Sequence, residues 1–594
     1  MVLLDWIIVS VYILAAIGIG LYFTKRAAAS TTNYFVAGRT LPWFVAGTSI
    51  LATTFSSDTP LVVAGISRQT GIYGHWFWLS AAIGQTATVF FFARLWRRTE
   101  IMTDIEFVAK RYSPSRATSI LRIFKVFFDG VLINCIVMAS VTLAMAKIIK
   151  VLLNLPDVTL FHFPLFGDVT WAAILLLGLS GVAVLYATLS GLYGVVYTDL
   201  IQFVLAMIGS IGLAVIVYID ASGGNGLLEK LTAAPGFKPN SLNFFPDFNS
   251  STLMTFTFFV YIFVTWWYRA PGNGYYAQRL LATRSEKDSF LAFLWFNLCQ
   301  YIIRPWPWII VGLFSLHYLP GLEDPESSYP AMINLFLPAG LKGVIVASLL
   351  AAFMSTIDTH LNWGTSYVVN DFYRPFINKD KSMKHYVAVS RIAMLLFTAI
   401  ALVITTKLTS VLGVYKYLIV VFGGVGTVMI ARWYWWRVNP YSEISAIAAS
   451  LIVANFLEVK LTSSAHADLF AVRVVITIFT VTVTWVVVTL LTSEKTPGKH
   501  TITFYSKMKI PGLGWKKVRE LTGTKPRPQE FIENLIAWLT CVVFIFSLML
   551  GIGKILFHEW SSGLACLGIA IVTGYVLKKL MAGMQFLGIA RKTD

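Results

Sequence analysis

Residues 47–60 read Gly47-Thr-Ser-Ile-Leu-Ala-Thr-Thr-Phe-Ser-Ser-Asp-Thr-Pro60, and this stretch decides the fold. It belongs to the second predicted membrane crossing, yet polar residues and a proline interrupt it near the middle. Lipid cannot satisfy backbone N–H and C=O groups, so backbone leaves the helix at membrane depth only where it is buried in protein or lines a cavity. The interruption therefore predicts a cavity within a membrane protein.

A second interrupted segment, Thr265-Trp-Trp-Tyr-Arg-Ala-Pro-Gly-Asn-Gly274, belongs to the seventh predicted crossing. Each interrupted segment opens a run of five predicted crossings, and because five is odd the second run enters the membrane in the opposite orientation. Inverted repeats of this kind place solute and ion sites where the interrupted helices meet near the midplane. We therefore expect a five-plus-five-helix inverted repeat, with residues 31–220 as the first repeat and 252–437 as the second.

The composition is that of a membrane protein throughout. Of the 594 residues, 57% are hydrophobic and 13% are charged, whereas an ordinary soluble domain has about a quarter charged residues. Apolar runs of about 20 residues, the length that crosses the hydrocarbon core, recur along the chain, and about 15 are predicted. We expect an all-α integral membrane protein with three further parts: an extra N-terminal helix in 1–30, an outward loop at 221–251, and about four extra helices in 438–594 with a cytoplasmic loop at 494–530.

The net charge of +18 would favour a nucleic-acid partner in a soluble chain. Here the basic residues fall in the short loops of one side, which is the positive-inside pattern. We therefore expect no nucleic-acid partner and a multi-pass protein of the cell membrane (inner or plasma membrane), with the N-terminus outside and the C-terminus cytoplasmic. The Trp-Tyr-Trp-Trp run at 433–436, between Arg432 and Arg437, is predicted to be an aromatic anchor at the membrane surface.

The eighth helix of the predicted core, residues 341–373, contains Ala351-Ala-Phe-Met-Ser-Thr-Ile-Asp-Thr-His-Leu-Asn362. Small or polar residues recur on one face of it at helical spacing, at Ser348, Ala352, Ser355, Thr359 and Asn362. Na⁺ is expected to take roughly five or six oxygen ligands, which hydroxyls and the carbonyls freed at the first interruption can supply. The alternative is close helix packing alone, which leaves Asp358 unexplained, because a buried carboxylate is costly unless paired or functional.

A second carboxylate within an apolar segment is Asp199, in Val195-Val-Tyr-Thr-Asp-Leu-Ile-Gln-Phe203. Asp199 and Gln202 share one face of the fifth core helix. Two interpretations stay open: a second cation site, or a carboxylate that caps or snorkels near the inner end of its helix.

Arg304 lies in the middle of the seventh core helix, in Arg304-Pro-Trp-Pro-Trp308. An arginine within the membrane is a functional hypothesis by default, and a guanidinium can bind a carboxylate through two parallel hydrogen bonds. We expect Arg304 either to bind an anionic group of a solute or to pair with Asp58 or Asp358 and hold helices together.

In combination these segments resemble the sodium:solute symporter family, which includes sodium/glucose and sodium/proline symporters and has the leucine-transporter fold. The resemblance covers nearly the whole chain. It is carried by Asn33-Tyr-Phe-Val-Ala-Gly-Arg-Thr-Leu-Pro42, by Thr198-Asp199 with Gln202, by Gln278-Arg279, and by the 351–362 segment followed by Asn370-Asp-Phe-Tyr373. It implies a secondary active transporter, not an enzyme, which couples symport of a small organic solute to Na⁺ by alternating access.

By position, the resemblance implies a Na⁺ site made by the backbone carbonyls of Ala52, Phe55 and Ala352 and the hydroxyls of Ser355 and Thr356. Some members bind a second Na⁺ at positions that match Asp199, Ser355, Asp358 and Thr359. Asp358 replaces a hydroxyl of that pattern. The resemblance therefore leaves open whether a second cation binds at Asp199, Asp358 and Thr359, and whether the site takes Na⁺ or a proton.

The positions that hold sugar in a galactose-transporting member are occupied here by Thr54, Thr59, Phe77, Thr265 and Trp295. Most polar partners of a sugar are therefore missing. A family tyrosine that covers the substrate from the inside is retained as Tyr268. With Arg304, these residues are the predicted substrate site, and they favour a carboxylate-bearing solute or an amino acid over the alternative, a Na⁺/sugar symporter.

The strongest alternative from another class is a membrane-embedded solute sensor. The sequence shows no attached soluble domain, which argues against it, and no nucleophile, base and orienting residue gather at the spacing of an enzyme site. The expected partners are the solute, Na⁺ and the lipid bilayer, and the protein is expected to function as a monomer.

Overall fold

The computed structural model describes residues 1–27, 30–156, 158–163, 167–223, 226–461, 469–524 and 529–584. Within these ranges the single sheet is a short antiparallel hairpin of β1 (Phe161–Phe163) and β2 (Gly167–Val169), with Phe161 opposite Val169. Eleven helices among the described residues are long and apolar enough to cross a membrane. The expected all-α membrane class is confirmed, whereas the number of crossings stays a prediction. Residues 525–528 of the expected cytoplasmic loop and the charged end at 585–594 lie outside the described residues.

The chain folds into two compact units, and each is built from three separate stretches. The first unit contains Met1–His75, Phe128–Pro246 and Ile303–Val414. The second contains Trp76–Phe127, Asp247–Ile302 and Tyr415–Asp594. The chain passes from one unit's stretch into the other's within η4 (Val126–Ile133), η7 (Cys299–Ile303) and α20 (Val411–Tyr434).

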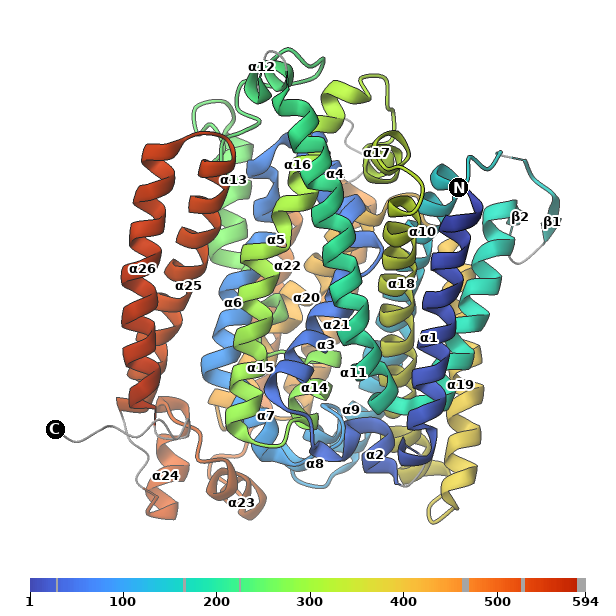
Figure 1. Cartoon of the computed structure of the whole chain (residues 1–594). Helices are drawn as coiled ribbons and strands as arrows, with labels where there is room; N and C mark the ends of the chain where they lie inside the picture. The colour runs from blue at the N-terminus through green and yellow to red at the C-terminus, as the bar shows by residue number, and fades with distance from the viewer. Residues whose placement is uncertain are drawn as a thin grey trace. The chain divides into compact units, whose positions relative to one another are not determined.

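The first unit is a set of long helices (Figure 1). Its central helix is α11, which bends at Gly191, where φ is 50°, and contacts α1, α3 and α18. Its elements are α1 (Leu3–Ala27), α2 (Thr31–Val36), η1 (Ala37–Arg39), α3 (Trp43–Phe55), α4 (Asp58–Thr70), η2 (Ile72–His75), α10 (Asn134–Leu152), α11 (Trp171–Ser222), α12 (Leu227–Thr232), α16 (Pro305–Tyr318), η8 (Pro325–Ser327), α17 (Ser328–Phe336), α18 (Leu341–Ser366), η9 (Tyr367–Ile377) and α19 (Met383–Thr405).

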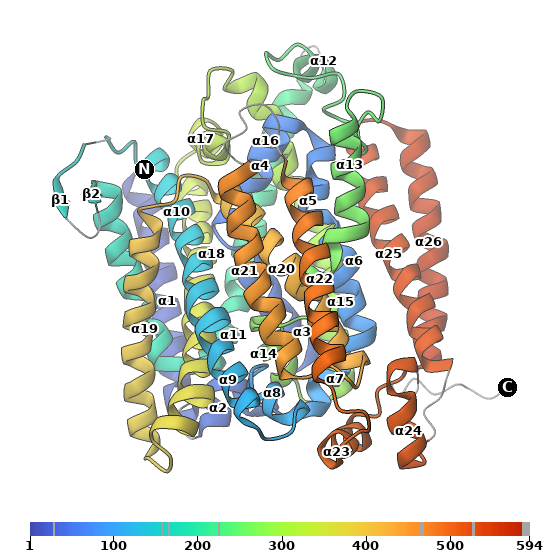
Figure 2. The ribbon, with the colours of Figure 1, turned by 180° about the vertical axis from the view of Figure 1, so that it is seen from behind.

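The second unit includes two helical hairpins, α21 with α22 and α25 with α26, whose members lie side by side (Figure 2). Its elements are α5 (Trp76–Leu79), α6 (Ala81–Ala87), η3 (Thr88–Phe92), α7 (Ala93–Thr99), α8 (Glu106–Arg111), α9 (Arg116–Lys125), α13 (Thr252–Val260), η5 (Tyr261–Thr265), η6 (Trp266–Arg269), α14 (Tyr275–Ala282), α15 (Glu286–Leu298), η7 (Cys299–Ile303), α21 (Pro440–Leu461), α22 (Phe470–Thr492), α23 (Lys499–Met508), η10 (Leu513–Trp515), α24 (Lys516–Thr522), α25 (Gln529–Leu556) and α26 (Trp560–Gly583).

The first predicted interruption is confirmed. Helix α3 ends at Phe55 and α4 begins at Asp58. Between them Ser56 has φ 43° and ψ 159°, a backbone conformation that ends a helix. Pro60 lies in the first turn of α4, where its missing N–H removes no helical hydrogen bond. The last carbonyls of α3 are thus released in the interior of the first unit.

The second predicted interruption is also confirmed, in the second unit. The helix that starts as α13 widens through the π-helical turn η5 and then tightens into the 3₁₀ turn η6, which ends at Arg269. A turn follows in which Gly272 and Gly274 have positive φ values of 77° and 70°, a conformation open to glycine. Helix α14 then starts at Tyr275.

The N-terminal helix α1 is attached to the start of α18 by Asp5. Its Oδ1 accepts hydrogen bonds from the N–H groups of Gly340 and Gly343, at 2.8 and 2.9 Å. A helix N-terminus has unpaired N–H groups and a positive dipole end, both of which a carboxylate satisfies. The helices approach so closely that a Cβ on Gly343 would lie 2.6 Å from the Cα of Asp5.

The prediction of a surface anchor at 433–436 is wrong for its first residue. Trp433 is fully buried in the second unit, with its ring centroid 4.9 Å from that of Trp96 and 4.3 Å from that of Phe107. Trp515 donates its indole N–H to the Trp433 carbonyl at 2.6 Å. The neighbouring Arg432 is buried too, 3.3 Å from Glu443. Packing of the 499–522 segment against α20 places these residues in a core that the aromatic run alone did not reveal.

Candidate ion and solute site

The carbonyl end of α3 lies against α18 inside the first unit. A helix leaves its last four carbonyls without intrahelical partners, and they carry the negative end of the helix dipole. The hydroxyl of Thr356, on α18, is hydrogen-bonded to one of these, Thr53 O, at 3.1 Å and also to Ala352 O at 3.0 Å. The predicted ligands Ala52, Phe55, Ala352 and Thr356 therefore belong to two helix segments that meet at this point.

Ser355, the fifth predicted Na⁺ ligand, points to a carboxylate. Its hydroxyl donates to Asp199 Oδ1 at 2.5 Å, and the hydroxyl of Ser49 donates to Asp199 Oδ2 at 2.5 Å. All three side chains are fully buried. Asp199 of α11 thus joins α3 and α18 through its two oxygens.

Asp358 and Thr359, the remaining residues of the predicted second cation site, lie on α18. Thr359 Oγ1 shares a hydrogen bond of 3.2 Å with Thr53 Oγ1 of α3. Asp358 is fully buried on α18 beside Thr359. Gln202 lies elsewhere: its Nε2 donates to the hydroxyl of Tyr12, on α1, at 2.7 Å. The structure brings Asp199 and Thr359 to α3 but directs Gln202 away from it.

The donor set consists of hydroxyl, carbonyl and carboxylate oxygens. Such oxygens suit hard cations. Across the part of the chain that the structure describes, no three His, Cys, Asp or Glu side chains gather as metal ligands. The oxygens around Thr53 and Ser355 are thus of the type that a hard cation takes.

Arg304 lies at the same carbonyl end of α3. It follows the π-helical turn η7 and precedes α16, which begins at Pro305. Its Nη1 donates to Thr54 Oγ1 at 2.9 Å and to Leu51 O at 3.3 Å, and its Nη2 donates to Thr54 O at 2.5 Å. The guanidinium carbon lies 5.3 Å from the ring centroid of Phe55. Sequence reasoning missed this capping role, although freed carbonyls always require donors.

Thr54, which Arg304 contacts, and Thr59 lie on either side of the interruption between α3 and α4. Thr59 Oγ1 donates to Thr54 O at 3.2 Å. In the fully described stretch 45–67, Thr54 and Thr59 are the residues that retain partial exposure, while their neighbours are buried. Three predicted substrate residues, Thr54, Thr59 and Arg304, therefore lie together beside accessible space.

The other predicted substrate residues belong to the second unit. Thr265 Oγ1 lies 3.3 Å from Ser80 Oγ, and the ring of Phe77 packs edge-on against Tyr261 at 6.1 Å between centroids. The hydroxyl of Tyr268 accepts a hydrogen bond of 2.5 Å from Arg269 Nε. Trp295 is half-buried on α15.

A polar network in the second unit was not predicted. Arg269 Nη1 donates to the hydroxyl of Tyr276 at 2.8 Å, Gln85 Nε2 donates to the same hydroxyl at 3.2 Å, and the Tyr301 hydroxyl donates to Gln85 Oε1 at 2.6 Å. Gln85 and Arg269, two polar residues within apolar segments, were the available signal.

Comparison with known proteins bears on the chain as a whole. A model of the sodium:solute symporter family matches residues 34–448. A sodium/glucose cotransporter from Vibrio parahaemolyticus is 25% identical over 483 residues, which are 77% of this chain and 85% of that protein. A high-affinity proline transporter from Bacillus subtilis (strain 168) is 24% identical over 451 residues, which are 73% of this chain and 88% of that protein.

Among solved structures, the substrate-bound, outward-open state of a Na⁺-coupled sialic acid symporter superposes with a TM-score of 0.64 and 20% sequence identity. The match covers 84% of this chain and 100% of that one. At this level of identity the likeness shows the fold, and it confirms the fold expected from the sequence.

Proposed function

The chain belongs to the sodium:solute symporter family and carries a small solute together with Na⁺, and we propose that it binds this Na⁺ between the carbonyl end of α3 and α18. The observation that carries the proposal is the hydrogen bond from Thr356 Oγ1 to Thr53 O at 3.1 Å. It supports a contact between the released carbonyls of one helix and the hydroxyls of another. The proposed ligands are the carbonyls of Ala52, Phe55 and Ala352 and the hydroxyls of Ser355 and Thr356.

Na⁺ acts in this proposal by replacing hydrogen bonds with ion–oxygen contacts. The single hydrogen of the Thr356 hydroxyl is shared between Thr53 O and Ala352 O. When Na⁺ binds, lone pairs of Thr356 Oγ1 and Ala352 O turn to the cation together with the other proposed ligands, which strengthens the link between α3 and α18. The transporter then alternates between outward-open and inward-open states, and solute favours the same linked state, so the Na⁺ gradient drives uptake.

We further propose a second cation site at Asp199, Asp358 and Thr359. The two hydrogen bonds of 2.5 Å from Ser49 and Ser355 to Asp199 support it, because they hold a carboxylate where α3, α11 and α18 meet. Na⁺ flux measured per solute in proteoliposomes, at two pH values, tests this site. A stoichiometry that is unchanged in an Asp199→Asn variant would contradict it.

For the solute we propose a carboxylate-bearing compound, such as an amino acid, which Arg304 recognises. The support is a buried guanidinium beside Thr54 and Thr59, the two partly exposed residues of the interruption. The remaining predicted substrate residues, Phe77, Thr265, Tyr268 and Trp295, belong to the second unit and stay predictions from the sequence. They offer a carboxylate no second positive charge.

Arg304 provides the test. Arg304→Ala should reduce binding of a carboxylate solute by on the order of tenfold or more, because it removes charge-assisted hydrogen bonds. Arg304→Lys retains the charge but not the planar guanidinium, so its affinity for the carboxylate solute should lie between that of the wild type and that of Arg304→Ala. Binding is measured by thermal shift with a panel of amino acids, small carboxylates and sugars, with and without Na⁺. Normal carboxylate binding by Arg304→Ala would refute the assignment, and Na⁺-dependent stabilisation by sugars alone would favour a Na⁺/sugar symporter.

A sensor differs from a carrier in moving no solute. Purified protein in proteoliposomes should accumulate the solute under an inward Na⁺ gradient and not under an equal choline gradient. Solute binding without accumulation would favour a membrane-embedded sensor instead.

The protein is a multi-pass membrane protein, and we propose an outside N-terminus, a cytoplasmic C-terminus, and a monomer as the functional form. The basic loops support the orientation, and we propose inverted repeats at 31–220 and 252–437 as the core. A cysteine introduced at Ser506, in α23, should resist an impermeant thiol reagent applied to intact cells, whereas one introduced at Asn249 should react. Crosslinking in membranes at low protein density tests the monomer.

A further inference from the structure

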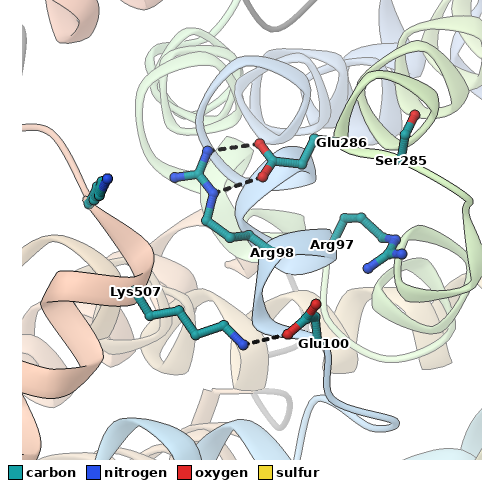
Figure 3. A pocket seen from close by; sticks show the side chains of 7 residues that line it. Arg97, Arg98, Glu100, Ser285, Glu286 and Lys507 are labelled. Carbon is teal, nitrogen blue, oxygen red and sulfur yellow. Dashed lines mark hydrogen bonds and ion pairs between the residues drawn. The ribbon is translucent and has the colours of Figure 1, made fainter.

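A pocket of about 550 Å³ opens among α7, the turn before α15 and α23, all within the second unit (Figure 3). Its charged lining consists of Arg97, Arg98, Glu100, Glu286, Lys507 and Lys509. It contains four basic side chains and two carboxylates. None of them belongs to the proposed Na⁺ or solute site.

Both carboxylates are already paired. Arg98 holds Glu286 with two hydrogen bonds, Nε to Oε1 and Nη2 to Oε2, each 2.8 Å long. Lys507 Nζ lies 2.5 Å from Glu100 Oε2. Figure 3 shows these two pairs on opposite sides of the pocket. Two of its four positive charges are therefore compensated within the pocket.

Arg97 and Lys509 carry the remaining charges. The Arg97 guanidinium is oriented by backbone carbonyls, with Nε to Thr283 O at 2.6 Å and Nη2 to Arg284 O at 3.5 Å. Its Nη1 makes no hydrogen bond within the described residues. Lys509 makes no ion pair with any residue that the structure describes. The pocket thus has a preoriented guanidinium and an ammonium in excess of its carboxylates.

The backbone of Lys509 supports a role for its side chain. Lys509 ends α23 in the left-handed conformation, with φ 48° and ψ 49°. Glycine is favoured at this position after a helix, and a residue with a Cβ is strained there. A lysine in place of glycine therefore places a cation at the pocket at a cost in backbone free energy.

From this geometry we propose that the pocket binds a phosphate-bearing anion, to which Arg97 and Lys509 supply the excess positive charge. Guanidinium groups match the oxygens of a phosphate in shape and charge, and lysine adds a point charge. The volume is within the usual range for small-molecule sites. Two sources share this chemistry: the headgroup of an anionic phospholipid and a free phosphate compound. Since Arg98 Nη1 also donates to Met508 O at 2.7 Å, such an anion adds a second link between α7 and α23.

The test compares two arms with the full chain in nanodiscs. In the first, nanodiscs of phosphatidylcholine receive pyrophosphate, with sodium chloride at equal ionic strength as reference, and the melting temperature gives the apparent affinity. In the second, nanodiscs contain phosphatidylglycerol, and native mass spectrometry counts retained lipid. We expect binding in one arm, which identifies the source. Lys509→Gly and Arg97→Gln should weaken the apparent affinity by on the order of tenfold, or lose the retained lipid.

Lys499→Gln is the matched control, because it removes one charge from α23 outside the pocket lining. It should bind as the wild type does. Lys509→Gly keeps the test sharp even if Arg97→Gln folds poorly, because glycine suits the backbone at that position. The proposal is overturned if wild-type protein binds in neither arm, or if Lys509→Gly binds as well as Lys499→Gln.

Discussion

Thr356 has one hydroxyl hydrogen and two carbonyl oxygens within reach, Ala352 O on its own helix and Thr53 O on α3. A single hydrogen cannot satisfy two acceptors fully, so one lone pair at this point is always poorly matched. A cation does not have this restriction, since it accepts several oxygen lone pairs at once. Because of that difference, we propose that ion–oxygen contacts replace the shared hydrogen bond when Na⁺ binds.

Ser355→Ala and Thr356→Ala should each raise the Na⁺ concentration for half-maximal uptake, by on the order of tenfold, because each removes one of roughly five or six oxygen ligands. The measurement is solute uptake into proteoliposomes across a series of Na⁺ concentrations. Ser366→Ala is the control: Ser366 is buried on the same helix, but its hydroxyl donates to Trp363 O at 2.6 Å. Undiminished Na⁺ affinity in both site variants would rule out the proposed ligands.

For single residues, the sequence predicted which side chains belong to the site better than it predicted their hydrogen-bond partners. Ser355 could be chosen because helical spacing and a family resemblance both point to it, and Thr356 because the resemblance does. The bond from Ser49 to Asp199 could not, because it depends on the relative rotation of α3 and α11, which no local pattern encodes. For Arg304 the sequence offered solute or carboxylate partners, and the structure adds the carbonyls of Leu51 and Thr54.

At the scale of elements, the interruption after α3 rests on the backbone of Ser56. Its φ of 43° with ψ 159° is unfavourable for any residue with a Cβ. Ser56→Gly should therefore retain uptake and stabilise the protein by up to about 1 kcal/mol, whereas the β-branched Ser56→Val should destabilise it by roughly 1–3 kcal/mol. Thermal unfolding of the purified variants measures both. Equal melting temperatures for the two variants would show that this backbone is not strained.

The contact of Asp5 between α1 and α18 should also contribute to the stability of the fold. Asp5→Ala removes the acceptor for the N–H groups of Gly340 and Gly343, which should lower the free energy of unfolding by about 1–2 kcal/mol. Asp5→Asn keeps an acceptor but loses the charge at the helix N-terminus, so it should cost less. Thermal unfolding again provides the measurement, and Glu323→Ala, at an exposed position in a loop, serves as control. An Asp5→Ala protein as stable as that control would contradict a structural role for Asp5.

Both helix interruptions could be predicted from the sequence, because proline, glycine and polar residues seldom cluster within an apolar run unless the helix breaks there. The π-helical turns could not. The turn η7 at Cys299–Ile303 directly precedes Arg304 and Pro305. Proline at 305 signals a disturbed helix, but whether the chain kinks, tightens or widens depends on the packing around Arg304, Phe55 and Trp308.

At the scale of the molecule, the two units divide the predicted sites unequally. Every predicted cation ligand, from Ala52 to Thr359, belongs to the first unit, together with Arg304. Phe77, Thr265, Tyr268 and Trp295 belong to the second. A cation held by the proposed ligands would therefore contact side chains and carbonyls of the first unit alone.

Na⁺ should stabilise the whole folded protein. A ligand that binds the folded state alone stabilises it by RT ln(1 + [L]/Kd), which is about 2.7 kcal/mol at a hundredfold excess over Kd. Purified wild-type protein should therefore melt a few degrees higher in NaCl than in choline chloride at the same ionic strength. The shift should shrink in Ser355→Ala and Thr356→Ala and persist in Ser366→Ala, because that hydroxyl bonds within its own helix. Equal melting temperatures in both salts would contradict a Na⁺ site in the folded protein, whereas an equal shift in all variants would place the ion elsewhere than between α3 and α18.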